Sequence, residues 1–313
     1  MPEPRVPAAP DVRIETYDGE GCVTLSVGST TARFLPSVGM LCTSLRRDGA
    51  EYVSLDGGVA AFREGHTTGI PLLHPWANRL SEEVYRAGRI VVDLRGLDIH
   101  RDGNGLPMHG TMVGPRHWEI TRAGPSGDAA VVGAVFHYDT EPLLAAFPFP
   151  HRIGLIAALT GDRLRITTTI EPVGRRGVPV SFGFHPYFAL PGVPRDDWVV
   201  ELPTCTHVGL DPRGIPDGSR EHVPAGPVAV KGRGFDDHYE LSSQRSLAVA
   251  GGGHRLEVRF GSGFPFAQVY APTERSVIAL EPMSATTDAL VTGDHPTVAP
   301  GSRFRATFTI LAS

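Results

Sequence analysis

A histidine with two unusual neighbours is the strongest candidate for chemistry in this chain. His185 follows the apolar run 178–184, which predicts a strand that enters a hydrophobic core. Pro186 fixes its own φ and favours an extended conformation of the residue before it, so His185 is expected at a rigid strand end. Tyr187 adds a flat apolar face beside the imidazole. The combination suits a site that stacks on a ligand and transfers protons; the alternative is a histidine of the core.

A carboxylate in an apolar setting is the second candidate. Glu281 ends the apolar run 277–280, which predicts a buried strand. A buried carboxylate is costly unless it is hydrogen-bonded or has a task. Burial raises the pKa of a carboxyl group, which favours a general base that works near neutral pH. The alternative is a strand-end glutamate that points to water.

The segment 75–79 could recognise hydroxyl groups. It passes from Pro75 and Trp76 to the polar pair Asn78 and Arg79. Amide and guanidinium groups present donors in fixed planes, which suits hydroxyl recognition, and Trp76 offers an aromatic face. The alternative is a turn that carries a surface arginine.

Two further turns carry polar candidates. His109 and Gly110 form a pair after Pro107, which predicts a tight turn that lets another group approach closely. Asp236 and Asp237 follow a glycine-rich stretch. Taken alone, the first is an ordinary turn histidine and the second a pair of solvated turn residues or a helix cap. Combined with Glu281 and His185, they complete a set of groups suited to proton transfer on a carbohydrate.

The elements that must position these residues are predicted to be strands. Apolar and polar residues alternate with a period of two in several runs, which indicates half-buried antiparallel strands. These runs are 23–27, 90–94, 130–136, 163–170, 255–260, 277–280 and 303–310. A single short helical turn is predicted at 141–146, before two prolines. The pattern predicts an all-β protein with one sandwich-like domain over 11–313, a loose arm over 1–10 and a long surface loop over 211–234.

Composition narrows the possible partners and compartments. The net charge is −5 and no Lys/Arg-rich run occurs, so nucleic acid is not expected as a partner. The one lysine, Lys231, lies in a glycine-rich context, which argues against Schiff-base chemistry. Three scattered cysteines form no CxxC pair and no disulfide framework, which fits a reducing cytoplasm. We find neither a hydrophobic signal segment nor an apolar run of about 18 residues, so no contact with a membrane is expected.

Several enzyme classes lack their expected motifs. The thirteen histidines include no H-x-H or H-x-x-x-H spacing, which argues against a metal-dependent isomerase or a cupin-like protein. The chain has no G-x-S-x-G elbow of a serine hydrolase and no P-loop. We therefore expect no metal and no cofactor.

The order of the motifs resembles a known family, the aldose 1-epimerases or mutarotases. The resemblance spans the chain from about residue 35 to the C-terminus. It rests on Asn78-Arg79 after Pro-Trp, His109-Gly110, the segment 185–188, the Phe-Asp-Asp-x-Tyr segment 235–239, Gln268-Val269-Tyr270 and Glu281-Pro282. One departure is Ala189, because the galactose-specific members commonly have Asn after the corresponding Phe.

This resemblance implies a galactose mutarotase-like β-supersandwich, mostly antiparallel with long loops, and a cofactor-free active site in a cleft. It implies Glu281 as general base and His185 as general acid. The remaining candidates become sugar-binding residues: Trp76, Asn78, Arg79, His109, Tyr187, Asp236 and Gln268. Asp236 is preferred to Asp237 because the family's acid lies three residues before an aromatic, here Tyr239.

The implied activity is interconversion of the α and β anomers of a free hexose by ring opening and reclosure, in a monomer or homodimer. Ordinary pKa values of about 4.3 for Glu and 6.5 for His leave a window in which Glu281 is ionised and His185 protonated. Two alternatives remain: a hexose-6-phosphate 1-epimerase, which needs a cationic clamp, and a non-catalytic sugar-binding module on the same fold.

Overall fold

The computed structural model describes residues 9–313, and these form a mostly antiparallel β protein. Of the expected N-terminal arm, residues 1–8 lie outside the described residues, and the first strand begins at Asp11. A five-stranded sheet consists, in spatial order, of β1 (Asp11–Tyr17), β2 (Glu20–Val27), β3 (Thr30–Leu35), β4 (Leu41–Arg47) and β5 (Ala50–Glu51). Consecutive strands are neighbours here, as in a meander of hairpins.

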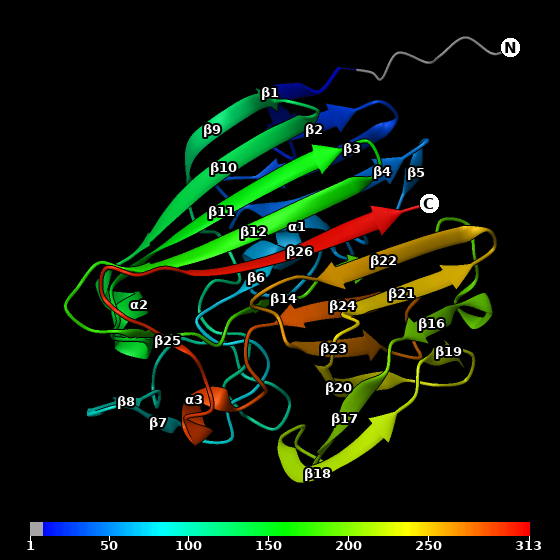
Figure 1. Cartoon of the computed structure of the whole chain (residues 1–313). Helices are drawn as coiled ribbons and strands as arrows, with labels where there is room; N and C mark the ends of the chain where they lie inside the picture. Colours follow the sequence, from blue (N-terminus) through cyan, green and yellow to red (C-terminus); the bar gives the residue numbers. More distant parts are fainter. Residues whose placement is uncertain (1–8) are drawn as a thin grey trace, which may run out of the picture.

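A nine-stranded sheet holds the longest strands. Its spatial order is β19 (Gly226–Ala229), β16 (Val199–Leu202), β21 (Ser246–Gly251), β22 (His254–Phe260), β26 (Phe304–Ala312), β12 (Arg163–Pro172), β11 (His151–Thr160), β10 (Ala129–Tyr138) and β9 (Glu119–Ser126). The C-terminal strand β26, red in Figure 1, lies between β12 and β22 and so joins the two halves of this sheet.

An eight-stranded sheet carries four of the candidate residues, Tyr187, Asp236, Gln268 and Glu281. Its spatial order is β18 (Pro216–Val223), β17 (Cys205–Leu210), β20 (Phe235–Leu241), β23 (Phe266–Ala271), β24 (Ile278–Met283), β14 (Gly183–Phe184) and β6 (Leu72–Leu73), with β15 (Tyr187–Phe188) also paired to β24. The main cluster of buried apolar residues draws on all three larger sheets, for example Leu25, Ile166 and Val269. This shared core is the packing expected of stacked sheets in a sandwich.

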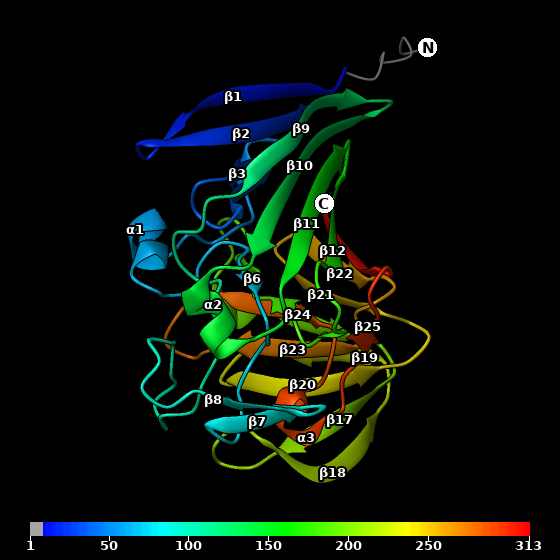
Figure 2. The same cartoon turned by 90° about the vertical axis from the view of Figure 1, so that its left-hand side faces the viewer.

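Small elements complete the chain. They are the pairs β7 (Val84–Ala87) with β8 (Ile90–Asp93) and β13 (Val178–Pro179) with β25 (Thr297–Val298), a 3₁₀ turn η1 (Arg195–Asp197), and the helices α1 (Gly58–Arg63), α2 (Glu141–Ala146) and α3 (Ala289–Thr292). Figure 2 shows the β7–β8 hairpin beside α3, with which β7 is in contact. Among the described residues, none of the helices has the length and apolar character that crossing a bilayer requires.

Most of the expected elements are confirmed. The runs at 163–170, 255–260 and 303–310 correspond to β12, β22 and β26, and the helical turn at 141–146 is α2. The all-β sandwich class is also confirmed.

Two expectations were wrong. The stretch 211–234 is not one long loop, because it contains β18 and β19, which pair with β17 and β16. The run 178–184 is not one strand but the two short strands β13 and β14. These parts pair with different partners. The strand β13 pairs with β25, Ser181 forms a bridge with Trp76, and β14 pairs with both β6 and β24.

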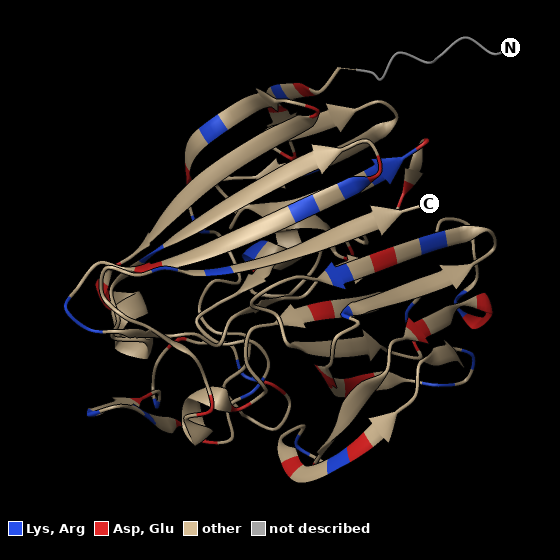
Figure 3. Ribbon diagram, viewed as in Figure 1, with Lys and Arg blue, Asp and Glu red and all other residues tan. Residues whose placement is uncertain are grey.

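Charges of both signs are interspersed on the surface. Figure 3 shows acidic and basic residues along the same strands, as on β18 and β22, and no basic stripe in this view. The three cysteines are buried and carry free thiols. Reactive, exposed thiols are therefore not a feature of the described residues.

Candidate active site

The register of three neighbouring strands gathers polar side chains on one face of the eight-stranded sheet. Gln268 of β23 lies directly opposite Glu281 of β24, and His238 of β20 lies directly opposite Gln268. Side chains alternate along a strand, so Tyr270 and Asp236, each two residues from one of these positions, share their face. Neighbours of the opposite parity, such as Val269 and Leu280, are buried in the core.

Glu281 lies within its strand rather than at its end, which corrects the expectation from the sequence. The strand β24 continues through Pro282 to Met283, and Glu281 is only 2% exposed. The pairing with β23 extends past the end of the apolar run because backbone hydrogen bonding does not depend on apolar side chains. The carboxylate therefore lies on the surface of the sheet, inside the protein.

His185 lies at the end of β14, as the sequence predicts, and its loop is held firmly. The backbone N–H groups of His185 and Tyr187 donate to the carbonyl groups of Pro71 and Gly69, at 3.1 and 2.8 Å. The Tyr187 ring stacks on the imidazole with a centroid distance of 4.3 Å, and its hydroxyl lies 3.3 Å from Nε2. The same hydroxyl lies 2.7 Å from Thr67 Oγ1. Tyr187 is thus in place to restrict the orientation of the imidazole.

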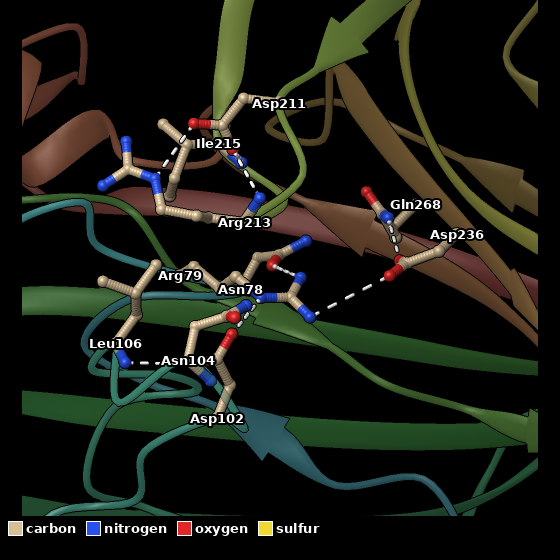
Figure 4. A network of polar contacts seen from close by, with 10 residues as sticks. All are labelled: Asn78, Arg79, Asp102, Asn104, Leu106, Asp211, Arg213, Ile215, Asp236 and Gln268. Carbon is tan, nitrogen blue, oxygen red and sulfur yellow. Dashed lines mark hydrogen bonds and ion pairs between the residues drawn. The ribbon is translucent and has the colours of Figure 1, made fainter.

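Arg79 is fixed by three oxygen partners. Its Nε donates to Asp102 at 2.7 Å, and its Nη1 donates to the side-chain oxygen of Asn78 at 3.1 Å. A third, longer ion pair joins Nη2 to Asp236 at 3.9 Å. Figure 4 shows Arg79 between the loop that carries Asp102 and the aspartate of β20. A guanidinium held on several sides presents its remaining donors in a defined direction.

His109 reaches the site from a tight turn. Gly110 has φ +70°, and a Cβ added there would lie 2.2 Å from the carbonyl oxygen of His74. This close approach of two backbone segments confirms the role predicted for the His-Gly pair. The turn places the His109 ring beside that of His185 in a T-shaped arrangement with ring centroids 5.4 Å apart, and the His100 ring lies parallel to His109 with centroids 6.2 Å apart.

These side chains surround a cavity with a volume of about 160 Å³. The predicted residues that line it are Asn78, Arg79, His109, His185, Tyr187, Asp236, Gln268 and Glu281. Trp76 does not line it: the indole is fully buried in the main hydrophobic core. Its place in the core gives no support to the expectation that Trp76 contacts a ligand.

The two neighbouring aspartates face different surroundings. Asp236 lines the cavity, and its carboxylate accepts a hydrogen bond of 2.7 Å from the Gln268 amide. Asp237 lies 3.1 Å from His207 and 3.7 Å from Arg233, outside the lining of this cavity. The geometry therefore selects Asp236 as the aspartate of the site.

Glu281 and His185 form a close, buried pair. Nε2 of His185 lies 3.3 Å from Oε1 of Glu281. Burial raises the pKa of Glu281 well above its ordinary value; the charge of Asp236 acts in the same direction, and Arg79 opposes it. Burial lowers the pKa of His185 to about 3, and Arg275 acts in the same direction. The raised pKa of Glu281 agrees with the sequence-based prediction.

The shifted pKa values of Glu281 and His185 therefore do not leave the pH window that ordinary values predict, in which Glu281 is ionised and His185 protonated. In a poorly hydrated site, the neutral acid and neutral imidazole are favoured over the ion pair. Both arrangements contain one proton, and they interconvert by its transfer across the contact between Glu281 and His185. The pair can consequently supply an acid and a base at once over the whole pH range in which it holds one proton.

Sequence reasoning did not name four supporting side chains as site residues: Thr67, Asp102, His238 and Tyr270, the last of which stands in the Gln268-Val269-Tyr270 motif. His238 is buried between the Gln268 amide oxygen, 3.2 Å from Nδ1, and Thr286, 3.0 Å from Nε2. Alternation from Gln268 and Asp236 could have indicated Tyr270 and His238, whereas Thr67 and Asp102 lie in loops without a periodic signal. Among the described residues, no cluster of three or more His, Cys, Asp or Glu side chains has an arrangement suited to a metal ion.

Comparisons with known proteins agree with this architecture. The sequence model of a family described as aldose 1-epimerase matches residues 22–311. A galactose mutarotase-like protein from Clostridium acetobutylicum has a similar structure, with TM-score 0.86, 18% identity, and coverage of 97% of this chain and 99% of the other. A galactose 1-epimerase from Lactobacillus acidophilus NCFM has TM-score 0.77 and 14% identity, with coverage of 98% of this chain and 99% of the other. An aldose epimerase homologue from C. elegans has TM-score 0.75 and 14% identity, with coverage of 97% of this chain and 99% of the other. No curated protein sequence matches the chain. At these identities, the structural likeness shows a shared fold.

Proposed function

The chain belongs to the aldose 1-epimerase family, and on this basis we propose that it interconverts the α and β anomers of an unphosphorylated hexose. One observation carries the proposal. A buried carboxylate and a buried imidazole, Glu281 and His185, lie 3.3 Å apart beside a small cavity lined by hydroxyl-binding groups. General acid–base catalysis requires such a pair within reach of the same substrate.

The proposed reaction transfers one proton off the sugar and one onto it. Glu281 takes the proton of the anomeric hydroxyl, and His185 gives a proton to the ring oxygen. The bond between the anomeric carbon and the ring oxygen breaks, and the anomeric C–O bond becomes a carbonyl. Both oxygens are attached to the same carbon, so an acid and a base that are neighbours can reach them together. After rotation of the aldehyde, the roles reverse and the ring closes on either face.

Substrate binding favours the arrangement that reacts, in which Glu281 is ionised and His185 is protonated. Hydroxyl groups that donate to Glu281 stabilise its ionised form, because hydrogen bonds to a carboxylate lower its pKa. The positive charge of Arg79 acts in the same direction. The sugar thereby helps to move the shared proton from Glu281 to His185. Neither a metal nor a cofactor is required for this step.

The proposed sugar contacts include both hydrogen-bond donors and a hydrogen-bond acceptor. Arg79 and the Asn78 amide can donate to hydroxyl groups, and Asp236 can accept from them. His109, Tyr187 and Gln268 line other parts of the cavity. The ligand is thus expected to be a polyhydroxyl ring whose orientation is set by several directional bonds.

We place the activity in one domain over residues 11–313 and in a reducing cytoplasm, in a monomer or homodimer without nucleic acid or membrane partners. The hydrophobic cluster common to the three larger sheets supports a single domain. Three buried free thiols, Cys22, Cys42 and Cys205, support a reducing compartment.

Exchange NMR on folded variants tests the proposal. Purified protein is mixed with a panel of free hexoses and hexose 6-phosphates, and transfer of magnetisation between α and β anomeric protons gives kcat and KM. Glu281→Gln keeps the shape of the side chain and removes the base, so we expect kcat to fall roughly 10²–10⁴-fold.

Glu257→Gln is the matched control. Glu257 is also buried in a strand, but it pairs with Arg255 and Arg259 away from the cavity. Near-wild-type exchange in folded Glu281→Gln would rule out Glu281 as the base, whereas sugar binding by wild type without any acceleration of exchange would favour the sugar-binding module. A kcat/KM for a hexose 6-phosphate at least ~100-fold above that of the free hexose would favour the phosphorylated substrate.

A further inference from the structure

A pocket with a volume of about 520 Å³ lies outside the candidate active site and is lined by basic and apolar residues. Its walls come from four segments that are far apart in the sequence: the turn 87–90 between β7 and β8, Phe149 after α2, residues 176–179, and residues 295–297. None of these residues lines the cavity of Glu281 and His185. The pocket is therefore a separate space, and the proposed proton transfer does not explain it.

One wall of the pocket is the β7–β8 hairpin, which is anchored to the helix α2. Within the hairpin, Ala87 lies opposite Ile90. The hydroxyl group of Tyr85, on the same strand as Ala87, donates to the carbonyl group of Ala146 in α2 at 2.7 Å. The strand β8 is also in contact with α2 (Figure 2). The hairpin and the segment that follows α2, with Phe149, are thus parts of one connected wall.

A second wall forms where two other segments approach each other closely. In the pair of β13 and β25, Pro179 lies opposite Thr297. A Cβ added at Gly177 would lie 2.8 Å from the methyl carbon of Thr297 and 3.1 Å from the carbonyl oxygen of Val298. Glycine permits this approach because it has no side chain. The backbone that carries Arg176, the residue before Gly177, is consequently held against β25.

Apolar side chains form the floor of the pocket. Phe149 and Ala87 are only 4% and 8% exposed, and both belong to the main hydrophobic core. Pro179 is buried as well, and the half-buried Ile90 packs against the same core. A ligand made only of charged oxygen atoms would leave this floor in contact with water, whereas a ligand with an apolar or aromatic body would cover it.

Basic side chains form the rim above this floor. Arg89 and Arg176 are exposed, and His295 is half-buried. The imidazole of His295 lies 3.1 Å from the carbonyl oxygen of Pro296 through Nδ1, which leaves Nε2 available to a ligand. Because the two arginines belong to different walls, their guanidinium groups can approach one ligand from two sides.

The rim has no acidic residue to neutralise it. No carboxylate lines the described walls, and Asp294, which precedes His295, is exposed outside the lining. Two other acidic residues on adjoining strands are engaged elsewhere: Asp93 pairs with Arg95, and Glu171 with Arg152 and Arg303. Among the described residues, Arg89 and Arg176 have no ion-pair partner. The pocket is thus a local positive site on a chain whose net charge is −5, which favours an anionic ligand.

The number of donors favours a ligand with several charged oxygen atoms. Guanidinium groups bind phosphate groups through paired hydrogen bonds, and a diphosphate offers acceptors for two such groups and an imidazole, whereas a single carboxylate has only two oxygen atoms. The volume lies in the range of pockets for organic ligands, about 300–1,000 Å³, and exceeds what an inorganic anion fills. The hydroxyl group of Thr297 adds a hydrogen-bonding group for the polar edge of the ligand's body.

We propose that this pocket is a second ligand site, which binds a nucleoside diphosphate with the base on the apolar floor and the phosphate groups between Arg89 and Arg176. His295 is a further contact of the phosphate groups, and Thr297 of the nucleoside. The inference does not depend on the proposed anomer interconversion, because the two sites share no lining residue.

Titration calorimetry on the full-length protein, in buffer without divalent cations, tests the site. The probes are ADP, adenosine and pyrophosphate. Wild type is compared with the double variant Arg89→Ala/Arg176→Ala. The matched control is Arg86→Ala/Arg175→Ala, which removes the same charge from two exposed positions of the same segments that do not line the pocket. Circular dichroism and thermal melting establish that all variants are folded.

We expect ADP to bind wild type with a Kd at or below about 1 mM. Adenosine and pyrophosphate should each bind at least about tenfold more weakly, because each lacks one half of the contacts. The variant Arg89→Ala/Arg176→Ala should weaken ADP binding at least about tenfold, since charge-assisted hydrogen bonds are lost, and the control should stay within about twofold of wild type. Arg79→Ala, which alters the candidate active site, should leave ADP binding unchanged.

Four results would each overturn the proposal. Absence of ADP binding at millimolar concentration would show that the pocket is not a nucleotide site. Equal losses in the two double variants would mean that only the overall charge attracts ADP. Pyrophosphate that binds as tightly as ADP would show that the apolar floor takes no part. Loss of ADP binding in Arg79→Ala, with retention in Arg89→Ala/Arg176→Ala, would place ADP in the candidate active site. None of these measurements uses anomer exchange, so the proposed function stands or fails separately.

Discussion

The carboxylate of Asp102 holds the guanidinium of Arg79 through a bond of 2.7 Å between Oδ2 and Nε. The Asp102 side chain is 5% exposed, whereas that of Asp236, the other carboxylate near Arg79, is 49% exposed. Asp102 also accepts the backbone N–H groups of Asn104 and Leu106. Asp102 is therefore the anchor that joins a loop to the arginine of the cavity, and Asp236 remains accessible to a ligand.

This anchor leads to a prediction for Asp102→Asn. The amide keeps the shape of the side chain but loses its charge, so Arg79 loses its strongest partner and its orientation becomes less defined. We expect KM for the sugar to rise about tenfold with a smaller change in kcat, because the acid–base pair is untouched. Asp93→Asn, in an exposed ion pair with Arg95, is the control and should change neither constant. An unchanged KM in folded Asp102→Asn would argue against the positioning role.

The acid–base pair predicts strongly non-additive losses. His185→Asn keeps a polar side chain but removes the titrating group, so kcat should fall roughly 10²–10⁴-fold. The double variant His185→Asn/Glu281→Gln should be little worse than the poorer single variant, because the two groups act as one unit. Sugar affinity, measured by titration calorimetry, should weaken much less in all three. Losses that multiply in the double variant would mean that the two residues act independently.

The pKa shifts of the pair predict a broad pH profile. Burial lowers the pKa of His185 to about 3 and raises that of Glu281, so the pair holds one proton between these limits. It gains a second proton only as the pH approaches the lowered value, and it loses its proton on the alkaline side as the pH passes the raised pKa of Glu281. We therefore expect kcat/KM to show no acid limb as the pH falls from 6.5 to 5, measured by exchange NMR with folding checked in each buffer. An acid limb near 6.5, the ordinary histidine value, would contradict this arrangement.

Local patterning explains how much of the fold could be predicted. A strand with one buried face alternates apolar and polar residues, and β12, β22 and β26 show this pattern clearly. The edge strand β18 is exposed along nearly its whole length, so its side chains carry no such alternation. Its existence depends on backbone pairing with β17, which only the folded chain reveals.

Residues of the candidate site could be predicted from the sequence where a titratable side chain lies within or directly after an apolar segment. Glu281 and His185 stand out because a titratable group within or after an apolar run is costly to bury. Asp102 and Thr67 do not stand out, since polar residues are ordinary in loops. Their importance arises from contacts with Arg79 and Tyr187, which are distant in sequence and depend on the three-dimensional arrangement. Trp76 is the opposite case, because an aromatic beside polar residues can belong to the core, and its burial there gives no support to the predicted ligand contact.

Buried neutral histidines predict a loss of stability in acid. Burial lowers the pKa of five fully buried histidines, His74, His109, His151, His185 and His238, and also that of the more exposed His100. The unfolded chain takes up protons at these residues as the pH falls through about 6.5, and the folded protein does not. The stabilisation is thus complete above this pH and is lost below it, by about 1.4 kcal/mol per pH unit for each histidine. Glu281 acts in the opposite direction. Because its pKa is raised in the folded state, its contribution to the free energy of unfolding falls as the pH rises.

Urea unfolding between pH 7 and pH 5 measures this loss. We expect the slope of the unfolding free energy to exceed that of a single proton. His151→Gln should reduce the slope, averaged over this range, by about 1 kcal/mol per pH unit, because the unfolded histidine is only partly protonated near its pKa, whereas His137→Gln, at an exposed position, should leave it unchanged. Equal slopes in the two variants would show that the buried histidines do not govern acid stability.

The close contact at Gly110 predicts that one methyl group disturbs both stability and binding. Alanine at φ +70° costs about 1–2 kcal/mol from the left-handed backbone alone. Its Cβ would in addition lie 2.2 Å from the His74 carbonyl oxygen, so the backbone must shift and His109 must shift with it. Gly127→Ala is the matched control, because Gly127 has φ +63° with no atom within 4 Å of an added Cβ. Urea unfolding should show a larger loss for Gly110→Ala than for Gly127→Ala, and exchange NMR should show a raised KM only for Gly110→Ala. Equal losses of stability and an unchanged KM would mean that the turn tolerates the methyl group and that the position of His109 does not depend on this contact.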